Sequence, residues 1–109
     1  MPLAAPTPIK CDLAIVGGGL AGGLIALAVA RQRPELKIVL VEQEAHFGGN
    51  HIWSFFASDI APEHRWLTAP LVTYGWSGYD VHFPEHSRSL ENIYYTIESE
   101  RLDWLLRHN

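Results

Sequence analysis

The chain has 109 residues, enough for one domain, and its 48% hydrophobic and 18% charged residues are typical of a globular protein rather than a disordered one. Its net charge of −4 disfavours DNA or RNA as the main partner, because phosphate-backbone binding needs a basic surface. The single cysteine, Cys11, excludes an internal disulfide framework and a cysteine-rich zinc site, so a reducing cytoplasm is the expected compartment.

The first ten residues contain three prolines and are predicted to form a flexible tail, with residues 11–109 as the folded part. Residues 13–30 carry no charged side chain, which raises the alternatives of a transmembrane helix or a secretory signal. Five glycines interrupt this run, and each costs a helix about 1 kcal/mol relative to alanine. We therefore expect two elements separated by a glycine turn.

Those elements begin a βαβ unit. Residues 11–16 are short, apolar and closed by glycine, which predicts a strand buried on both faces. Residues 20–33 form a helix whose apolar side chains nearly surround it, so we expect it to be buried, and Pro34 ends it. Residues 37–41 form a second strand, and the helical crossover requires the two strands to be parallel.

The second half is rich in aromatic residues, since every Trp, Tyr and Phe lies between residues 47 and 104. Residues 71–74 and 79–83 flank a glycine-bearing segment and are predicted to pair as a hairpin. Residues 92–97 are predicted to form a further strand. Ser99 is then the expected N-cap of a helix whose apolar face is Leu102, Leu105 and Leu106.

The glycine turn matches the dinucleotide-binding pattern G-x-G-x-x-G. Gly17 makes the tight turn, Gly19 lets backbone amides approach a pyrophosphate, and Gly22 lets the helix pack closely on the sheet. Glu42 follows at the end of the second strand, at the spacing of the carboxylate that binds ribose hydroxyls. The alternative interpretation is that the turn has no binding function and that Glu42 is simply a solvated surface residue. The predicted cofactor contacts in this region are Gly17, Gly19, Leu20, Ala21, Gly22 and Glu42.

A second glycine pair favours FAD over NAD. Gly48 and Gly49 follow Glu42 at a spacing that resembles FAD-binding flavoproteins of the glutathione reductase and amine oxidase type. Asn50 stands where many amine-oxidase-like proteins have arginine, so the resemblance is to the broad superfamily. Gly48, Gly49 and His51 complete the candidate cofactor contacts, with a structural or surface role equally open for His51.

The predicted fold class is therefore α/β: a Rossmann-like FAD-binding βαβ unit with parallel strands, followed by a small aromatic-rich β/α segment. A doubly wound nucleotide-binding fold has two βαβαβ halves, and only one βαβ unit is visible. We therefore expect the chain to be the N-terminal fragment of a larger FAD/NAD(P)-binding fold.

A closer resemblance lies in residues 48–55, whose sequence is GGNHIWSF. Together with the glycine turn and the segments around residues 64–66, 69–72, 81–84 and 99–101, it resembles the start of the bacterial lycopene β-cyclase family. Ile52 departs from the threonine expected there. The resemblance covers nearly everything from Cys11 onward.

The resemblance implies a flavoenzyme that cyclises the ends of lycopene to β-ionone rings without net redox chemistry. Reduced FAD, kept reduced by NAD(P)H, would stabilise the cationic transition state. The paired glutamates of the family, its expected acid, have no counterpart in these residues, so no catalytic residue is assigned. The 109 residues alone are expected to be inactive. The alternatives are an FAD-dependent monooxygenase or oxidoreductase of the same fold, and an FAD-binding fragment without activity.

Other side chains support competing interpretations. Trp53, Phe55 and Phe56 are candidates for a cofactor-proximal wall, although core packing is favoured for any single ring. Arg101 is placed either near the flavin phosphates or in an ion pair with Glu98. A metal site is an alternative suggested by the six histidines, but their spacing disfavours it. Because lycopene is carried in bilayers, we expect a cytoplasmic enzyme peripheral to the inner face of the bacterial membrane.

Overall fold

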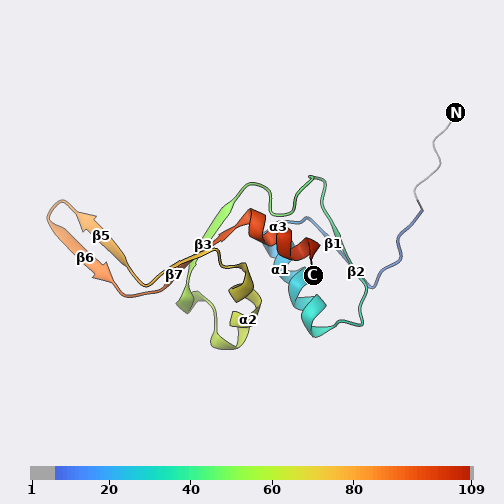
Figure 1. Cartoon of the computed structure of the whole chain (residues 1–109), viewed down its shortest axis with the longest axis horizontal. Coiled ribbons are helices and arrows are strands. Elements are labelled where there is room, and N and C mark those ends of the chain that lie inside the picture. Colours follow the sequence, from blue (N-terminus) through green and yellow to red (C-terminus); the bar gives the residue numbers. More distant parts are fainter. Residues whose placement is uncertain (1–6, 109) are drawn as a thin grey trace.

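The structure, a computed structural model, describes residues 7–108. Its α-helices and strands, in chain order, are β1 (Leu13–Val16), α1 (Leu20–Gln32), β2 (Ile38–Val41), β3 (Ile52–Phe56), α2 (Arg65–Thr68), β4 (Tyr74–Trp76), β5 (Tyr79–Phe83), β6 (His86–Leu90), β7 (Tyr94–Glu98) and α3 (Ser99–Arg107). Short 3-10 helices lie at Ala57–Asp59, Pro62–His64 and Ala69–Leu71. The molecule is elongated, with the β5–β6 hairpin at the end opposite to β1 and β2 (Figure 1). Its radius of gyration is 18.6 Å, against about 13 Å for a compact domain of 100 residues.

The expected βαβ unit is confirmed. β1 and β2 pair in parallel, with Leu13 opposite Ile38 and Val16 opposite Val41. α1 connects them, beginning after the glycine turn and ending two residues before Pro34. The class is mixed α/β, because two antiparallel sheets follow this parallel pair.

The larger antiparallel sheet has the order β3-β7-β4, so β7 is its central strand. Trp53 lies opposite Ile97, and Gly75 lies opposite Tyr95. A Cβ at Gly75 would lie 3.1 Å from the Tyr95 ring, so glycine lets the edge strand approach that ring. The strand predicted at residues 92–97 is confirmed as β7, shifted by two residues at its start and one at its end.

The core lies where this sheet meets α1 and α3. Leu71, Ile97 and Leu102 are buried, and Leu71 and Leu102 are fully enclosed. The predicted apolar face of the last helix is confirmed, since Leu105 and Leu106 pack against the same cluster. α1 and α3 lie side by side in Figure 1, and Gly23 permits this approach because a Cβ there would lie 3.0 Å from Leu102.

The expected burial of the first strand and helix is wrong. The Val16 side chain is 83% exposed, and within α1 only Gly23 and Ala26 are buried, with Ile25 51% exposed. The physical reason is the size of the parallel sheet: two strands with one helix leave their outer faces uncovered among the described residues. Among residues 7–108, no helix has the length and apolar character needed to cross a bilayer.

The hairpin predicted around residues 75–78 is also wrong. β4 pairs with β7, whereas β5 pairs with β6 through the two-residue connection Pro84-Glu85. Phe83 lies opposite His86 in this hairpin. The sequence did not predict β6, because this strand is almost entirely polar and shows no alternation of apolar and polar side chains.

Two smaller expectations changed as well. Ser99 is the first residue of α3 and not its N-cap, which is Glu98. The Ser99 hydroxyl accepts a hydrogen bond from the backbone amide of His51 at 3.2 Å, so it holds a distant loop instead of its own helix end. Most of the tail predicted for residues 1–10 lies outside the described residues.

Leu102→Ala should lower the free energy of unfolding by about 2–5 kcal/mol, because it opens a cavity at a fully enclosed core position. Urea denaturation of the chain measures this change. Ile52→Ala is the matched control, since its side chain is 70% exposed and truncation there should change stability by less than about 0.5 kcal/mol. Equal losses in the two variants would contradict this core assignment.

Candidate functional site

The chain turns from β1 into α1 through residues 17–19. Gly17 has φ +101°, a left-handed conformation that favours glycine, and its amide donates to the carbonyl of Val41 at 2.8 Å. A Cβ at Gly22 would lie 2.1 Å from the Gly17 carbonyl oxygen, so only glycine fits there. Gly17 and Gly22, two of the three motif glycines, thus contact each other directly. This contact lets the first turn of α1 pack against the end of β1.

The Glu42 carboxylate points at this turn. Oε1 accepts the Gly18 amide at 2.9 Å, and Oε2 accepts the Glu44 amide at 2.9 Å. The hydrogen bond from the Glu44 amide, followed by that from Gly18, lowers the pKa of Glu42 below its ordinary value. The carboxylate is therefore ionised at neutral pH, and it retains lone pairs for further donors because it offers about four acceptor positions.

A second loop joins the same turn. Gly48 and Gly49 have φ values of +83° and +66°, both in the left-handed region. The Gly48 amide donates to the Gly18 carbonyl at 2.6 Å. Gly18 must be small, because a Cβ there would lie 2.5 Å from the Phe47 ring. The two glycine-rich segments and Glu42 are therefore brought together around Gly18, although they lie far apart along the chain.

Backbone N–H donors at the start of α1 and the Glu42 carboxylate lie beside this turn. The first hydrogen bond of α1 runs from Gly23 to Gly19 at 2.8 Å, so the amides of residues 20–22 have no partner within the helix. The first turn carries no acidic side chain, and a Cβ at Gly19 would meet nothing within 4 Å. A cavity of about 240 Å³ at the carboxyl ends of β1 and β2 includes Gly17 and Glu42. Helix N-termini of this kind bind phosphate groups.

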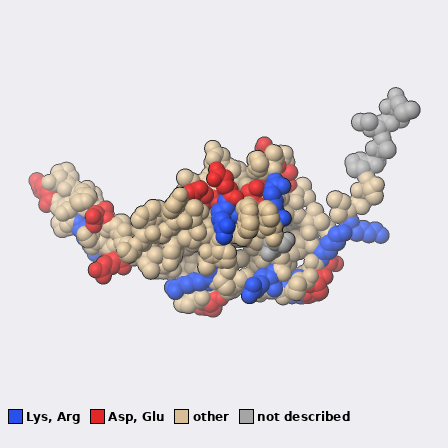
Figure 2. Space-filling model, in the orientation of Figure 1, with Lys and Arg blue, Asp and Glu red and all other residues tan. Residues whose placement is uncertain are grey.

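α3 holds the second loop in place. Asp103 accepts the Phe47 amide through Oδ1 at 2.7 Å, and it also receives Arg107 Nε at 3.0 Å. Arg107 Nη2 donates to the Ala45 carbonyl at 2.6 Å, and its guanidinium lies 5.2 Å from the centre of the Phe47 ring. We call this set Asp103, Arg107, Ala45 and Phe47 the loop clamp. Figure 2 shows acidic and basic atoms next to each other in the middle of the molecule, over α3.

Opposing effects act on the Asp103 carboxyl. Partial burial raises its pKa, but the hydrogen bond from the Phe47 amide and the interactions with Arg107 and His46 together lower the pKa below its ordinary value. The His46 Nδ1 lies 3.9 Å from Oδ2. Asp103 is thus ionised under all but acidic conditions.

The other predicted cofactor contacts, Leu20, Ala21 and His51, differ in how exposed their side chains are. Leu20 directs its side chain into the core cluster, which leaves only its backbone for a ligand, and Ala21 is exposed. His51 and Ser99 are joined twice, by the amide of His51 to the Ser99 hydroxyl and by the Ser99 amide to the His51 carbonyl at 3.0 Å. The His51 ring is tilted against Trp53, with 5.9 Å between ring centres.

The aromatic candidates mostly fill the core. Trp53 and Phe55 pack against the buried cluster, and Phe56 contacts Tyr94 with 5.3 Å between ring centres. Among the described residues, Arg101 forms no ion pair with Glu98. Its Nε donates to the Pro70 carbonyl at 2.9 Å, and its guanidinium lies over Trp104.

Three residues of the site were missed. Gly18 occupied a variable position of the motif, yet its amide and carbonyl connect the other parts. Asp103 and Arg107 are recognisable in the sequence only as an i, i+4 helical ion pair. Their partners lie 56 and 62 residues away, and no local pattern indicates such a distance.

The described residues thus define a mixed α/β protein with a parallel βαβ unit, whose glycine turn is hydrogen-bonded to an acid at the end of β2. The chain belongs to the lycopene cyclase family: the family described as "Lycopene cyclase protein" matches residues 12–109. The predicted family is thereby confirmed.

Curated relatives agree with this membership. The chain is 50% identical over 91 residues to a lycopene beta-cyclase of Pseudescherichia vulneris, covering 83% of this chain and 23% of that protein. It is 44% identical over 97 residues to a lycopene beta-cyclase of Pantoea ananas, covering 88% of this chain and 25% of that protein. The chain therefore spans about a quarter of the length of the curated relatives it matches. No solved structure matches it significantly.

Asp103→Asn should lower the free energy of unfolding at pH 7 by about 1 kcal/mol, because it weakens charge-assisted bonds of the loop clamp. The folded pKa lies below the unfolded one, so this contribution is complete above about pH 5 and is lost progressively as pH falls through the unfolded and then the folded pKa. Stability of the variant and the wild type should therefore converge between about pH 5 and pH 3.

Urea denaturation at a series of pH values measures this convergence. Glu85→Gln, in the turn of the β5–β6 hairpin, is the control for removal of one acidic charge. A constant difference between Asp103→Asn and wild type across the whole pH range would show that the Asp103 charge does not contribute to the loop clamp.

Proposed function

We propose that this chain forms the FAD-binding, Rossmann-like part of a lycopene β-cyclase, which closes the ends of lycopene to β-ionone rings in carotenoid biosynthesis. The observation that carries the proposal is the Glu42 carboxylate hydrogen-bonded to the glycine turn, within a chain of the lycopene cyclase family. The relatives bear the name lycopene beta-cyclase, which supports a carotenoid as substrate.

The proposed cofactor contacts follow from the chemistry of each group. The amides at the start of α1 would receive the diphosphate, and Gly19 leaves room for it. The free lone pairs of Glu42 would accept the ribose hydroxyls, and its negative charge disfavours a 2′-phosphate. The backbone of Gly48 and Gly49 would approach the same dinucleotide from the second loop.

The proposed chemistry involves no net redox change. Bound in its reduced form, with NAD(P)H as reductant, FAD supplies electron density that stabilises a cationic transition state. The residues described here bind and orient this group; none of them is assigned to proton transfer. We further propose that the enzyme works in the cytoplasm at the inner face of the membrane, because a hydrocarbon substrate partitions into lipid.

Gly19→Ala should lower the affinity of the chain for FAD at least about 10-fold while leaving the melting temperature unchanged, because its Cβ meets no protein atom. Equilibrium dialysis with FAD measures the affinity. Gly22→Ala is the contrasting variant: its Cβ would clash with the Gly17 carbonyl, so stability itself should fall. Unchanged FAD affinity in a folded Gly19→Ala chain would contradict a diphosphate at this turn.

A chimera tests the enzymatic proposal. This chain replaces the matching segment of the lycopene beta-cyclase of Pantoea ananas, and cyclic product from lycopene is measured by chromatography. We expect product from the chimera and at least about 10-fold less from its Glu42→Ala variant at limiting FAD, with rescue by excess FAD. A folded, FAD-loaded chimera that forms no cyclic product would contradict the proposal.

A further inference from the structure

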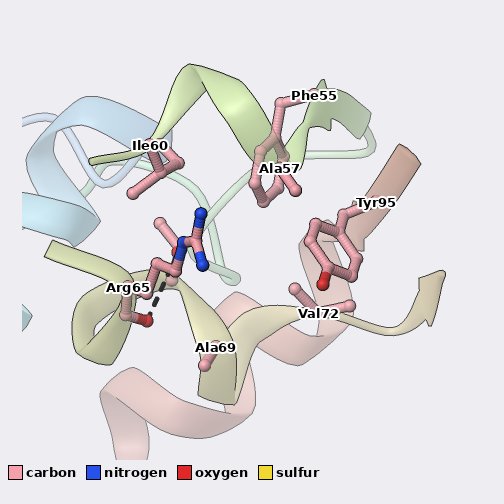
Figure 3. Close-up of a pocket in the computed structure, with 8 residues that line it drawn as sticks. Phe55, Ala57, Ile60, Arg65, Ala69, Val72 and Tyr95 are labelled. Atoms are coloured by element: carbon pink, nitrogen blue, oxygen red, sulfur yellow. Dashed lines mark hydrogen bonds between the residues drawn. The ribbon is translucent and has the colours of Figure 1, made fainter. Parts of the chain in front are cut away.

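A second cavity lies away from the glycine turn, between the antiparallel sheet and the segment around α2. Its volume is about 300 Å³, at the lower end of the range for small-molecule sites. Phe55 and Tyr95 form one wall, with 5.5 Å between ring centres, and Ile60 and Val72 contribute aliphatic surface (Figure 3). None of its lining residues belongs to the glycine turn, to the second loop or to the loop clamp.

One cation lines this otherwise uncharged cavity. In Figure 3 the Arg65 guanidinium extends from α2 toward Ile60 and the middle of the cavity. Among residues 7–108, no carboxylate pairs with it, and the hydrogen bond at this residue is made by its backbone carbonyl, which accepts the Thr68 hydroxyl at 3.5 Å. The guanidinium thus presents its planar set of N–H donors to whatever enters the cavity.

The lining defines the chemistry of a ligand. Two rings and aliphatic side chains favour an apolar body, because burying apolar surface releases water. A guanidinium beside apolar walls favours a carboxylate, which it binds through two parallel hydrogen bonds. We propose that this cavity binds a soluble amphiphilic carboxylate, with its chain against Phe55 and Tyr95 and its carboxylate on Arg65. The proposal does not depend on the flavin or on cyclase activity.

Titration calorimetry of the chain with decanoate tests the site. Arg65→Gln should weaken decanoate binding at least about 10-fold, because it removes the charge and the paired N–H donors that bind the carboxylate. Arg88→Gln, on the exposed strand β6, is the matched control and should leave binding unchanged. Methyl decanoate, which has no charge, should bind the wild type and Arg65→Gln equally.

A second variant tests the apolar part of the cavity. Ala57→Leu should weaken decanoate and methyl decanoate alike, because the larger side chain fills the space in which their chains would lie. Circular dichroism identifies a variant that fails to fold, and Arg65→Gln, at an exposed side chain, then remains the deciding test. Equal decanoate affinity in wild type and Arg65→Gln would overturn the proposal, as would binding only to anionic phospholipid vesicles.

Discussion

The backbone of Gly18 connects the parts of the candidate site. Its amide donates to Glu42 at the end of β2, and its carbonyl accepts the amide of Gly48 from the second loop. Both groups are satisfied only because the residue has no side chain, since a Cβ would collide with the Phe47 ring. This pair of hydrogen bonds sets the distance between the first turn, the acid and the glycine pair. Any ligand that uses all three depends on it.

The last helix stabilises this arrangement from outside. Asp103 and Arg107 hold the loop before Gly48, while Ser99 holds the backbone of His51 just after Gly49. The loop is therefore fixed on both sides of its left-handed glycines. Because Leu102 anchors the same helix in the core, the packing energy of a small hydrophobic cluster is coupled to the geometry of a polar loop.

The aromatic half has a mainly structural role in the described residues. Trp53 and Phe55 pack toward the core. On the β3-β7-β4 sheet the Tyr94 ring contacts those of Phe56 and Trp76, and Phe56 also contacts Tyr79 of β5. Phe55 also faces the second cavity, so one side chain takes part in both packing and a candidate binding surface. Tyr74 and Trp76 remain about half exposed, which leaves one edge of the sheet apolar.

Sequence by itself determined the βαβ unit, the position of the glycine turn and the acid that faces it. These features are local: an apolar run ended by glycine, a helix ended before proline, and a carboxylate at the next strand end. It also identified the apolar face of α3 from three leucines at helical spacing. The family followed from the unusual residues 48–55, as the match over residues 12–109 bears out.

Only the tertiary structure decided the strand pairing of the second half, the exposure of β1 and α1, and the role of Ser99. Pairing partners are chosen by contacts over long sequence distances, and a polar strand such as β6 carries no hydrophobic period to reveal it. Burial depends on how many elements cover a face, which the pattern of one element cannot specify. The loop clamp joins groups more than 50 residues apart, so its existence rests on how α3 packs and not on any motif.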